Sequence, residues 1–309
     1  MTQVSMQQVK ELRDRTQAGL NDCRSALIEA SGDMDKAVDI ILKKGLAKSA
    51  KRAGAVAAEG EIAASVASDK KGGVLVEVNI QTDFAARNDD FKTFVRNVLT
   101  VAAGAAVGAD LASLPYPAGG GSIEEVRQAL VGKLGENITL RRWAKLTSDK
   151  GLVHSYVHMG GKIGVLIALQ LGDVSKASDA TTLKFADDTA MQIAAMAPLH
   201  LTSADIPEDA KARQAEIYEA QLADEGKPVA ARPKIIEGKI AKWAKEICLA
   251  EQLSVLETEK TIDQIRAELS KALGTEVTIK SFVRYQLGEG IEKKKTDDFA
   301  AEVMKMSQV

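Results

Sequence analysis

Few side chains in this sequence have the types and spacing that chemistry on a substrate would need. His154 and His158 lie four positions apart in a predicted strand, so they share one face. No acid or cysteine at ligand spacing accompanies them, so we expect polar positions on a face or interface and no metal site. The Gly-Gly-Lys-Ile-Gly segment at 160–164 resembles a phosphate loop, but it precedes a strand and offers no helix N-terminus to an anion.

Other candidate sites are equally poor in chemistry. The glycine-lysine segment at 131–137 lacks the Ser or Thr after Lys that would reach Mg²⁺. Cys23 and Cys248 lie far apart in helical patterns, with neither metal spacing nor a disulfide framework, and we expect Cys23 to be core. The polar segment 1–15 lacks the apolar centre of a signal peptide, and no apolar stretch is long enough to span a bilayer. We therefore expect no cofactor, no membrane contact and a reducing, cytoplasmic location.

The segment Thr82-Asp83-Phe84 raises a different question, because a large apolar ring follows the end of an alternating strand. In one interpretation, Phe84 folds back over its own sheet and Asp83 caps the next helix. The corresponding corner of a second strand pair, at 171–180, contains no aromatic residue. The fold alone is therefore a poor explanation for Phe84, and a role outside the chain remains open.

The elements that position these residues follow from periodicity. The 309 residues favour two or three domains, and the net charge of −2 gives no overall attraction to nucleic acid. Residues 5–45 predict three short helices, with Ser5 and Gln8 as a capping box and Asp33 as an N-cap. The basic segment 43–54 predicts a mobile linker, which is either a solvated tether or a contact for RNA phosphates or an acidic partner.

Beyond the N-terminal module and linker, 1–54, the order strand, turn, strand, helix occurs twice, about 90 residues apart. It predicts an α+β fold with two related layers, each a small antiparallel sheet backed by helices. The first layer spans 55–147. The second spans 148–206 and returns at 255–290, after an inserted antiparallel helical arm at 207–254. A C-terminal module at 291–309 would end in a short amphipathic helix that contains Phe299, Val303 and Met304.

The arm is predicted from a charged helix followed by a second helix that Pro233 can begin. The second helix has an apolar seam with coiled-coil spacing, formed by Ile236, Ile240, Trp243 and Ile247. About 18 residues at 1.5 Å each predict an arm of roughly 27 Å.

Several of these segments together resemble bacterial translation elongation factor Ts. The segment "QTDFAARNDDF" is similar to that family's "QTDFVAKN…F" signature. Four other segments also match and occur along the chain in the family's order, the first before this signature and three after it: "VKELRDRTQAGLNDCRSAL", "GENITLRRW", "H..GGKIGVL" and "GEGIEKKKTDDFAAEV". The resemblance covers nearly the whole chain, from Val9 to the last predicted helix.

The resemblance implies a guanine nucleotide exchange factor for elongation factor Tu, with no chemistry of its own. In the family, the aromatic residue of this motif enters an apolar pocket of the Tu nucleotide domain. The neighbouring Asp helps to disturb the adjacent helix and loop, and the Mg²⁺ bound to GDP is dislocated. By resemblance, Asp83 and Phe84 would have these roles, flanked by Thr82 and Ala85.

The resemblance also implies a broad second contact with Tu. Its matching positions in the N-terminal module are Leu12, Arg13, Gly19, Leu20 and Asp22. Those in the second layer are His158, Gly161, Ile163 and Gly164, and the C-terminal tail would add more. The chain departs from the family pattern at Ala85, where the signature has Val, at Asn21, which is commonly apolar, and at Pro233, which interrupts a usual helix.

Two alternatives of other classes remain open from the residues alone. Three-helix, UBA-like modules such as 5–45 also occur in binders of ubiquitin-type polypeptides, so the chain could be a polypeptide-binding protein. An enzyme that uses the loop at 160–164 is the other alternative. For the exchange factor we expect no direct nucleic-acid partner, and both a monomer and a 2:2 complex with Tu are compatible with the sequence.

Overall fold

The structure is a computed structural model that describes residues 4–16, 18–119 and 121–292. The chain forms two compact units, each assembled from segments that are distant in the sequence. Unit 1 contains the described residues up to Ala63, then Val76–Trp143 and those from Gln286 onward, whereas unit 2 contains Ala64–Leu75 and Ala144–Tyr285. Helices combine with two small antiparallel sheets, so the predicted α+β class is confirmed.

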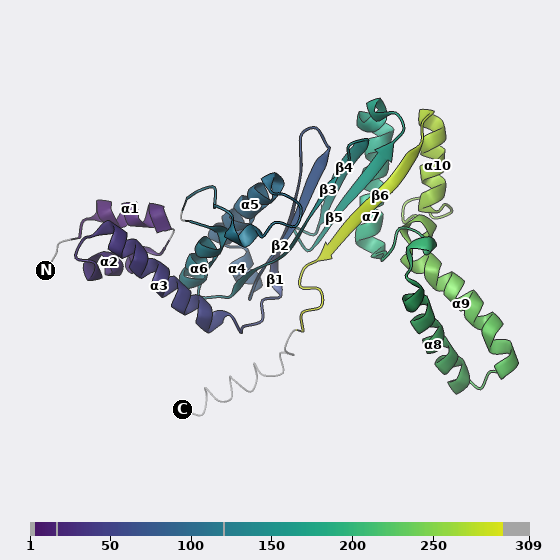
Figure 1. The fold of residues 1–309 in the computed structure, drawn as a ribbon, viewed down its shortest axis with the longest axis horizontal. Coiled ribbons are helices and arrows are strands. Elements are labelled where there is room, and N and C mark those ends of the chain that lie inside the picture. The colour runs from purple at the N-terminus through teal and green to yellow at the C-terminus, as the bar shows by residue number, and fades with distance from the viewer. Residues whose placement is uncertain (1–3, 17, 120, 293–309) are drawn as a thin grey trace. The chain divides into compact units, whose positions relative to one another are not determined.

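Unit 1 begins with a three-helix module formed by α1 (Met6–Thr16), α2 (Leu20–Glu29) and α3 (Met34–Arg52) (Figure 1). The predicted caps are confirmed: Ser5 and Gln8 bond reciprocally before α1, and Asp33 accepts two backbone hydrogen bonds of 3.1 Å at the start of α3. The module has its own small core: Val9, Leu12, Ala18, Cys23, Ala26, Leu27, Ala30, Ala37 and Ile41.

The basic segment 43–54 differs from the prediction of a mobile linker, because α3 continues through it to Arg52. The α3 helix packs on α6 (Ile123–Leu134) of the same unit. A Cβ built on Gly45, which is buried, would lie 3.6 Å from Cα of Ala129, so the helices approach closely here. The linker prediction is wrong because Ala and Lys are strong helix formers and α6 supplies a surface that the local sequence does not reveal.

The first sheet has the order β1-β2-β3, with β1 (Glu59–Val66), β2 (Gly72–Ile80) and β3 (Ile138–Thr147). The predicted hairpin of β1 and β2 is present, but its turn lies at 67–71, and Gly72 and Gly73 are already the first residues of β2. All of β2 beyond its first residue is buried. The chain then forms α4 (Asp83–Ala86), α5 (Asp89–Gly104) and α6. Gly135 ends α6 with φ of 75°, a left-handed conformation that glycine adopts without strain, and leads into β3.

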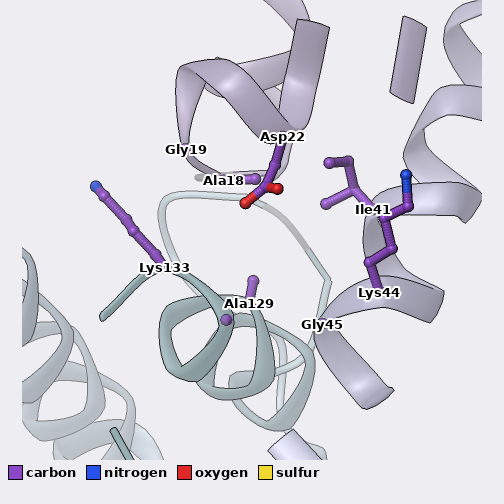
Figure 2. Close-up of a pocket in the computed structure, with 9 residues that line it drawn as sticks. Ala18, Gly19, Asp22, Ile41, Lys44, Gly45, Ala129 and Lys133 are labelled. Atoms are coloured by element: carbon purple, nitrogen blue, oxygen red, sulfur yellow. The ribbon is translucent and has the colours of Figure 1, made fainter. Parts of the chain in front are cut away.

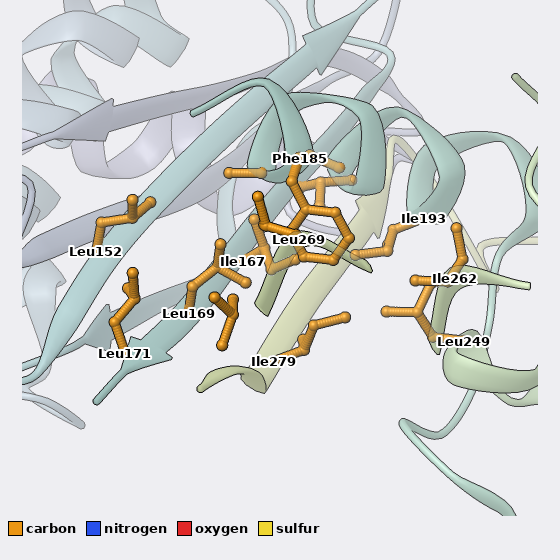
Figure 3. Close-up of a cluster of buried hydrophobic side chains, with 14 of the residues drawn as sticks. Leu152, Ile167, Leu169, Leu171, Phe185, Ile193, Leu249, Ile262, Leu269 and Ile279 are labelled. Carbon is orange, nitrogen blue, oxygen red and sulfur yellow. The ribbon is translucent and has the colours of Figure 1, made fainter. Parts of the chain in front are cut away.

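The second sheet has the order β4-β5-β6 and belongs to unit 2 except for Gln286, the last residue of β6. Its strands are β4 (Gly151–His158), β5 (Ile163–Leu171) and β6 (Val277–Gln286). β4 and β5 pair antiparallel, from Gly151 opposite Gln170 to His158 opposite Ile163. The helices α7 (Ala180–Met196) and α10 (Ile262–Leu273) complete its core, where Phe185 lies among aliphatic side chains (Figure 3).

An antiparallel helical arm is inserted between α7 and α10, and consists of α8 (Glu208–Asp224) and α9 (Arg232–Ile247). Pro233 lies in the first turn of α9, as predicted. The ammonium of Lys239 on α9 lies 5.2 Å from the ring centre of Tyr218 on α8, and Arg232 pairs with Glu219 at 2.9 Å. The predicted seam of α9 is half-buried: Ile236, Ile240, Trp243 and Ile247.

The two ends of the arm meet. His200 and Cys248 form an isolated parallel bridge, and the N–H of Leu199 donates to the carbonyl of Ile247 at 2.8 Å. β6 follows the arm in the chain and joins the sheet begun by β4, which confirms that the arm interrupts the second layer.

Two further expectations concern the remainder of the chain. The predicted C-terminal helix with Phe299, Val303 and Met304 lies outside the described residues. Among the helices that the structure does describe, none has both the length and the apolar character needed to cross a membrane.

Candidate functional site

The corner after β2 is a hydrogen-bonded turn of helix. Thr82 has extended backbone dihedrals and caps α4, because its hydroxyl oxygen accepts a hydrogen bond from the N–H of Ala85 at 3.2 Å. The backbone continues the turn, with the N–H of Asn88 bonded to the carbonyl of Ala85 at 3.0 Å. The side chain of Asn88 then caps α5 by accepting from the N–H of Asp90 at 2.9 Å. Both ends of the four-residue α4 are thereby fixed.

Two residues from the loop before β3 hold this corner from the side. The carboxylate of Glu136 accepts two hydrogen bonds from Thr82, from its N–H at 3.0 Å and from its hydroxyl at 2.7 Å. The N–H of the buried Asn137 donates to the side-chain oxygen of Gln81 at 2.6 Å. The start of the corner is therefore tied to a segment more than fifty positions away.

Phe84 is 80% exposed, the largest exposed fraction among the large hydrophobic side chains that the structure describes. The interpretation in which Phe84 folds over its own sheet is therefore wrong. The same interpretation made Asp83 a helix cap, but Thr82 and Asn88 are the caps. Asp83 is half-buried and pairs with Arg87 one turn later on at 2.8 Å. The result is a bare aromatic ring on a rigid turn, beside a carboxylate.

The predicted residues of the N-terminal module do not share one environment. Leu12 is fully buried in the module core, so it supports α1 from within and has no surface for a partner. Arg13 is exposed, and Leu20 is 46% exposed in the first turn of α2.

Gly19 and Asp22 face α6 of the same unit and line a cavity of about 20 Å³ with Lys44, Ala129 and Lys133 (Figure 2). That volume suits about one water molecule and is too small for an organic ligand.

The predicted residues of unit 2 lie at one β-turn. His158 ends β4, is exposed, and its Nδ1 lies 2.9 Å from the hydroxyl of Tyr156. Gly161, with φ of 96°, is part of the turn, and Ile163 and Gly164 begin β5 as half-buried and buried residues. The structure therefore brings these four residues together in a single hairpin.

The alternative chemistries find little support in the geometry. The loop at 160–164 turns directly into β5, as predicted, so no helix N-terminus faces it. His154 bonds through Nε2 to Asp187 of α7 at 3.0 Å. Within the described residues, no group of three or more His, Cys, Asp or Glu side chains could hold a metal ion.

Comparison with known proteins identifies the family. The family model described as elongation factor TS matches residues 81–289, which begin at the corner and include β3, the whole second sheet and the arm. A protein named elongation factor Ts from Clostridium acetobutylicum is 43% identical over 307 residues, or 99% of each chain. The chain belongs to the elongation factor Ts family.

Other elongation factor Ts relatives extend the match through the N-terminal module. One from Nitratiruptor sp. is 46% identical over 302 residues, covering 97% of this chain and 98% of its own. One from Clostridium perfringens is 43% identical over 304 residues, covering 98% and 99%. The family resemblance inferred from five short motifs is therefore confirmed.

Sequence reasoning missed the residues that hold the corner of this elongation factor Ts chain. Glu136 and Asn137 lie inside the recognised "GENITLRRW" segment, but their contacts with residues 81 and 82 are not local. One signal was available in the sequence: the segment that joins a helix to the next strand around residue 136 has a second copy around residue 275. In that copy, the side chain of Thr275 accepts a hydrogen bond from the N–H of Asp173, as Glu136 does from Thr82.

Proposed function

We propose that this chain is a guanine nucleotide exchange factor for elongation factor Tu in translation elongation. It would bind Tu with GDP, dislocate Mg²⁺ and promote GDP release so that GTP can bind, without chemistry of its own. Family membership supports the partner. The single observation that carries the mechanism is the 80% exposure of Phe84 on a hydrogen-bonded corner.

In this proposal Phe84 enters an apolar pocket of Tu, and Thr82, Asp83 and Ala85 flank it. Burying a Phe side chain contributes about 1.5–3 kcal/mol, enough to help shift a switch element but too little to expel tightly bound nucleotide alone. Asp83 is available because its pair with Arg87 is solvent-exposed, and such pairs contribute at most about 1 kcal/mol. Displacing Mg²⁺ removes the charge that holds the diphosphate, so the nucleotide is released faster.

A broad second contact must add to this effect. The exposed Arg13 and Leu20 of the module are proposed to contact Tu, and Gly19 and Asp22 would lie at the edge of that contact. Leu12 would support α1 from the core of the module. In unit 2, the hairpin that carries His158, Gly161, Ile163 and Gly164 is the other proposed contact. Coupling is reciprocal: if binding of the factor lowers the affinity of Tu for the nucleotide, binding of the nucleotide lowers the affinity of Tu for the factor by the same ratio.

The proposal includes a cytoplasmic location and no cofactor. It requires no direct nucleic-acid contact, and it is compatible with a monomer or with a 2:2 complex with Tu. A stoichiometry measurement on the mixed proteins distinguishes the two assemblies.

Release of fluorescently labelled GDP from purified Tu tests the function. We expect the wild-type chain to accelerate release and Phe84→Ala to slow the stimulated rate at least about tenfold, since the wedge would be gone. Val107→Ala is the matched control, because Val107 is also exposed, at 72%, in unit 1. Circular dichroism should be unchanged in both variants.

A wild-type rate in Phe84→Ala would reject the wedge mechanism. Failure of the wild-type chain to accelerate release would reject the exchange function as a whole. A general polypeptide-binding protein would have no reason to depend on Phe84.

A further inference from the structure

The chain contains an internal repeat that joins one helix to the next strand in both units. Residues 122–127 read Ser-Ile-Glu-Glu-Val-Arg, and residues 261–266 read Thr-Ile-Asp-Gln-Ile-Arg. Both segments begin with a capping box in which the first and fourth residues bond reciprocally. The helices α6 and α10 then end at left-handed glycines, Gly135 with φ of 75° and Gly274 with φ of 66°. The two copies therefore build the same helix–glycine–strand element.

The arginine of each copy confirms the equivalence. Arg127 donates from Nη1 to the carbonyl of Ile138, the first residue of β3, at 2.6 Å. Arg266 donates from Nη1 to the carbonyl of Val277, the first residue of β6, at 2.8 Å. The residues that follow the two glycines can therefore be compared directly.

The residues directly after the two glycines are Glu136 and Thr275, and the side chain of each supports a corner where a buried strand is followed by a short helix. Glu136 accepts a hydrogen bond from the N–H of Thr82 at 3.0 Å, and Thr275 accepts one through Oγ1 from the N–H of Asp173 at 2.8 Å. Thr82 and Asp173 both cap the short helix that follows. Side-chain support of this corner is therefore a repeated feature of the fold.

The two corners differ in the strength of the support and in what they present. Glu136 uses both carboxylate oxygens and also accepts from the Thr82 hydroxyl at 2.7 Å, whereas Thr275 offers one neutral oxygen. Charge-assisted hydrogen bonds are roughly twice as strong as neutral ones. The more strongly supported corner presents Phe84, and the equivalent position in the other copy is Ser175.

We infer that Glu136 is a positioning residue for exchange, which holds Thr82 so that α4 presents Phe84 in one orientation. The inference rests on the proposed function. Phe84 is exposed and takes its direction from α4, which has only four residues and would not be stable alone. Fixing this turn before the encounter lowers the entropy lost when the ring is buried in a partner.

Stimulated GDP release from Tu, measured over a range of factor concentrations, tests the inference. We expect Glu136→Ala to lower the maximal rate about tenfold, with less than about a twofold change in the half-saturating concentration, because the broad contacts remain. Glu136→Gln keeps an acceptor oxygen and should recover part of the rate. The matched control is Thr275→Ala, which removes the equivalent support from the corner that lacks the aromatic and should leave the rate unchanged.

The double variant Glu136→Ala with Phe84→Ala separates positioning from general damage. If Glu136 acts through Phe84, removing both should be no worse than removing Phe84 alone. Hydrogen exchange should also be faster at the amides of Thr82 and Ala85 in Glu136→Ala than in the wild type.

Three results would overturn the inference. A wild-type maximal rate in Glu136→Ala, while Phe84→Ala is impaired, removes the positioning role and leaves the proposed function standing. If Glu136→Ala lowers the maximal release rate as much in the Phe84→Ala variant as in the wild type, Glu136 does not act through Phe84. Unimpaired release in Phe84→Ala itself rejects the wedge and the positioning role together.

Discussion

The carboxylate of Glu77, fully buried in β2, accepts a hydrogen bond of 2.5 Å from Nε of Arg142 on β3. Its other oxygen accepts from Arg141 and from the N–H of Gly288, both at 2.9 Å. Burial alone would raise the pKa of Glu77, but these hydrogen bonds and the charge of Arg142 outweigh it and hold the pKa below its ordinary value. The buried carboxylate therefore ties the turn after β6 to strands β2 and β3.

Glu77→Gln should lower the free energy of unfolding at pH 7 by about 3 kcal/mol, since it removes the charge that Arg141 and Arg142 face. A carboxyl group with a lowered pKa stabilises the folded state above its ordinary pKa, and that contribution disappears as the pH falls through the folded pKa. Wild-type stability should thus fall more steeply than that of Glu77→Gln below about pH 4.5. Urea unfolding at pH 7 and at pH 3.5 checks both effects.

Glu61 on the neighbouring strand β1 is the control, because its pKa is shifted in the opposite direction to that of Glu77. Burial raises the pKa of Glu61, so its charge at pH 7 opposes folding. Glu61→Gln should therefore unfold at the same or a higher urea concentration than the wild type. Equal losses in both variants would contradict the specific role assigned to Glu77.

Gly45 tests the finding that 43–52 is a docked helix. Gly45→Ala should be neutral or stabilise by up to about 1 kcal/mol, because Ala favours helix and the added Cβ would sit at an ordinary contact distance of 3.6 Å from Ala129. Gly45→Leu should force α3 away from α6. Limited digestion with trypsin, which cuts after the basic residues of 43–52, should be slow in the wild type and Gly45→Ala and fast in Gly45→Leu. Equally rapid cleavage in all three would restore the linker interpretation.

The two cysteines should be protected in the folded chain. Both side chains are fully buried, and burial followed by the charges of Glu251 and Asp205 raises the pKa of Cys248 to about 11. At pH 8 only about one thousandth of Cys248 would then be the reactive thiolate. We expect Ellman's reagent to titrate two thiols rapidly in urea and neither rapidly in buffer.

In Cys248→Ser, the remaining slow reaction of Cys23 reports how often the three-helix module opens. A rapid stoichiometric reaction of either thiol in buffer would show that the buried positions are wrong.

Local signals in the sequence predicted local structure well. The capping residues Ser5 and Asp33 start helices that the structure contains, since a cap depends on residues only two or three positions away. The start of α9 near Pro233 follows for the same reason. The identity of the exposed corner was also predictable, because a second strand pair without an aromatic provided an internal comparison.

What the sequence did not predict depends on distant contacts. The segment 43–54 has the composition of a tether, and it is α6, eighty or so positions later, that makes most of it a docked helix. The family motif implied that Leu12 contacts the partner. Its place in the apolar spacing of the first helix also fits the core position that it occupies. The support of Thr82 by Glu136 joins residues 54 positions apart and leaves no trace in hydrophobic periodicity.

The bridge between His200 and Cys248 has a consequence for how the chain can change length. Because the entry and exit of the arm are already joined at its base, the closure of unit 2 is independent of how far α8 and α9 extend. Whole helical turns can be added or deleted at the tip near Gly226, or a foreign domain inserted there, without altering the spacing that β5 and β6 need to pair. The arm is therefore the natural place for lineages of this family, or a protein engineer, to attach something new.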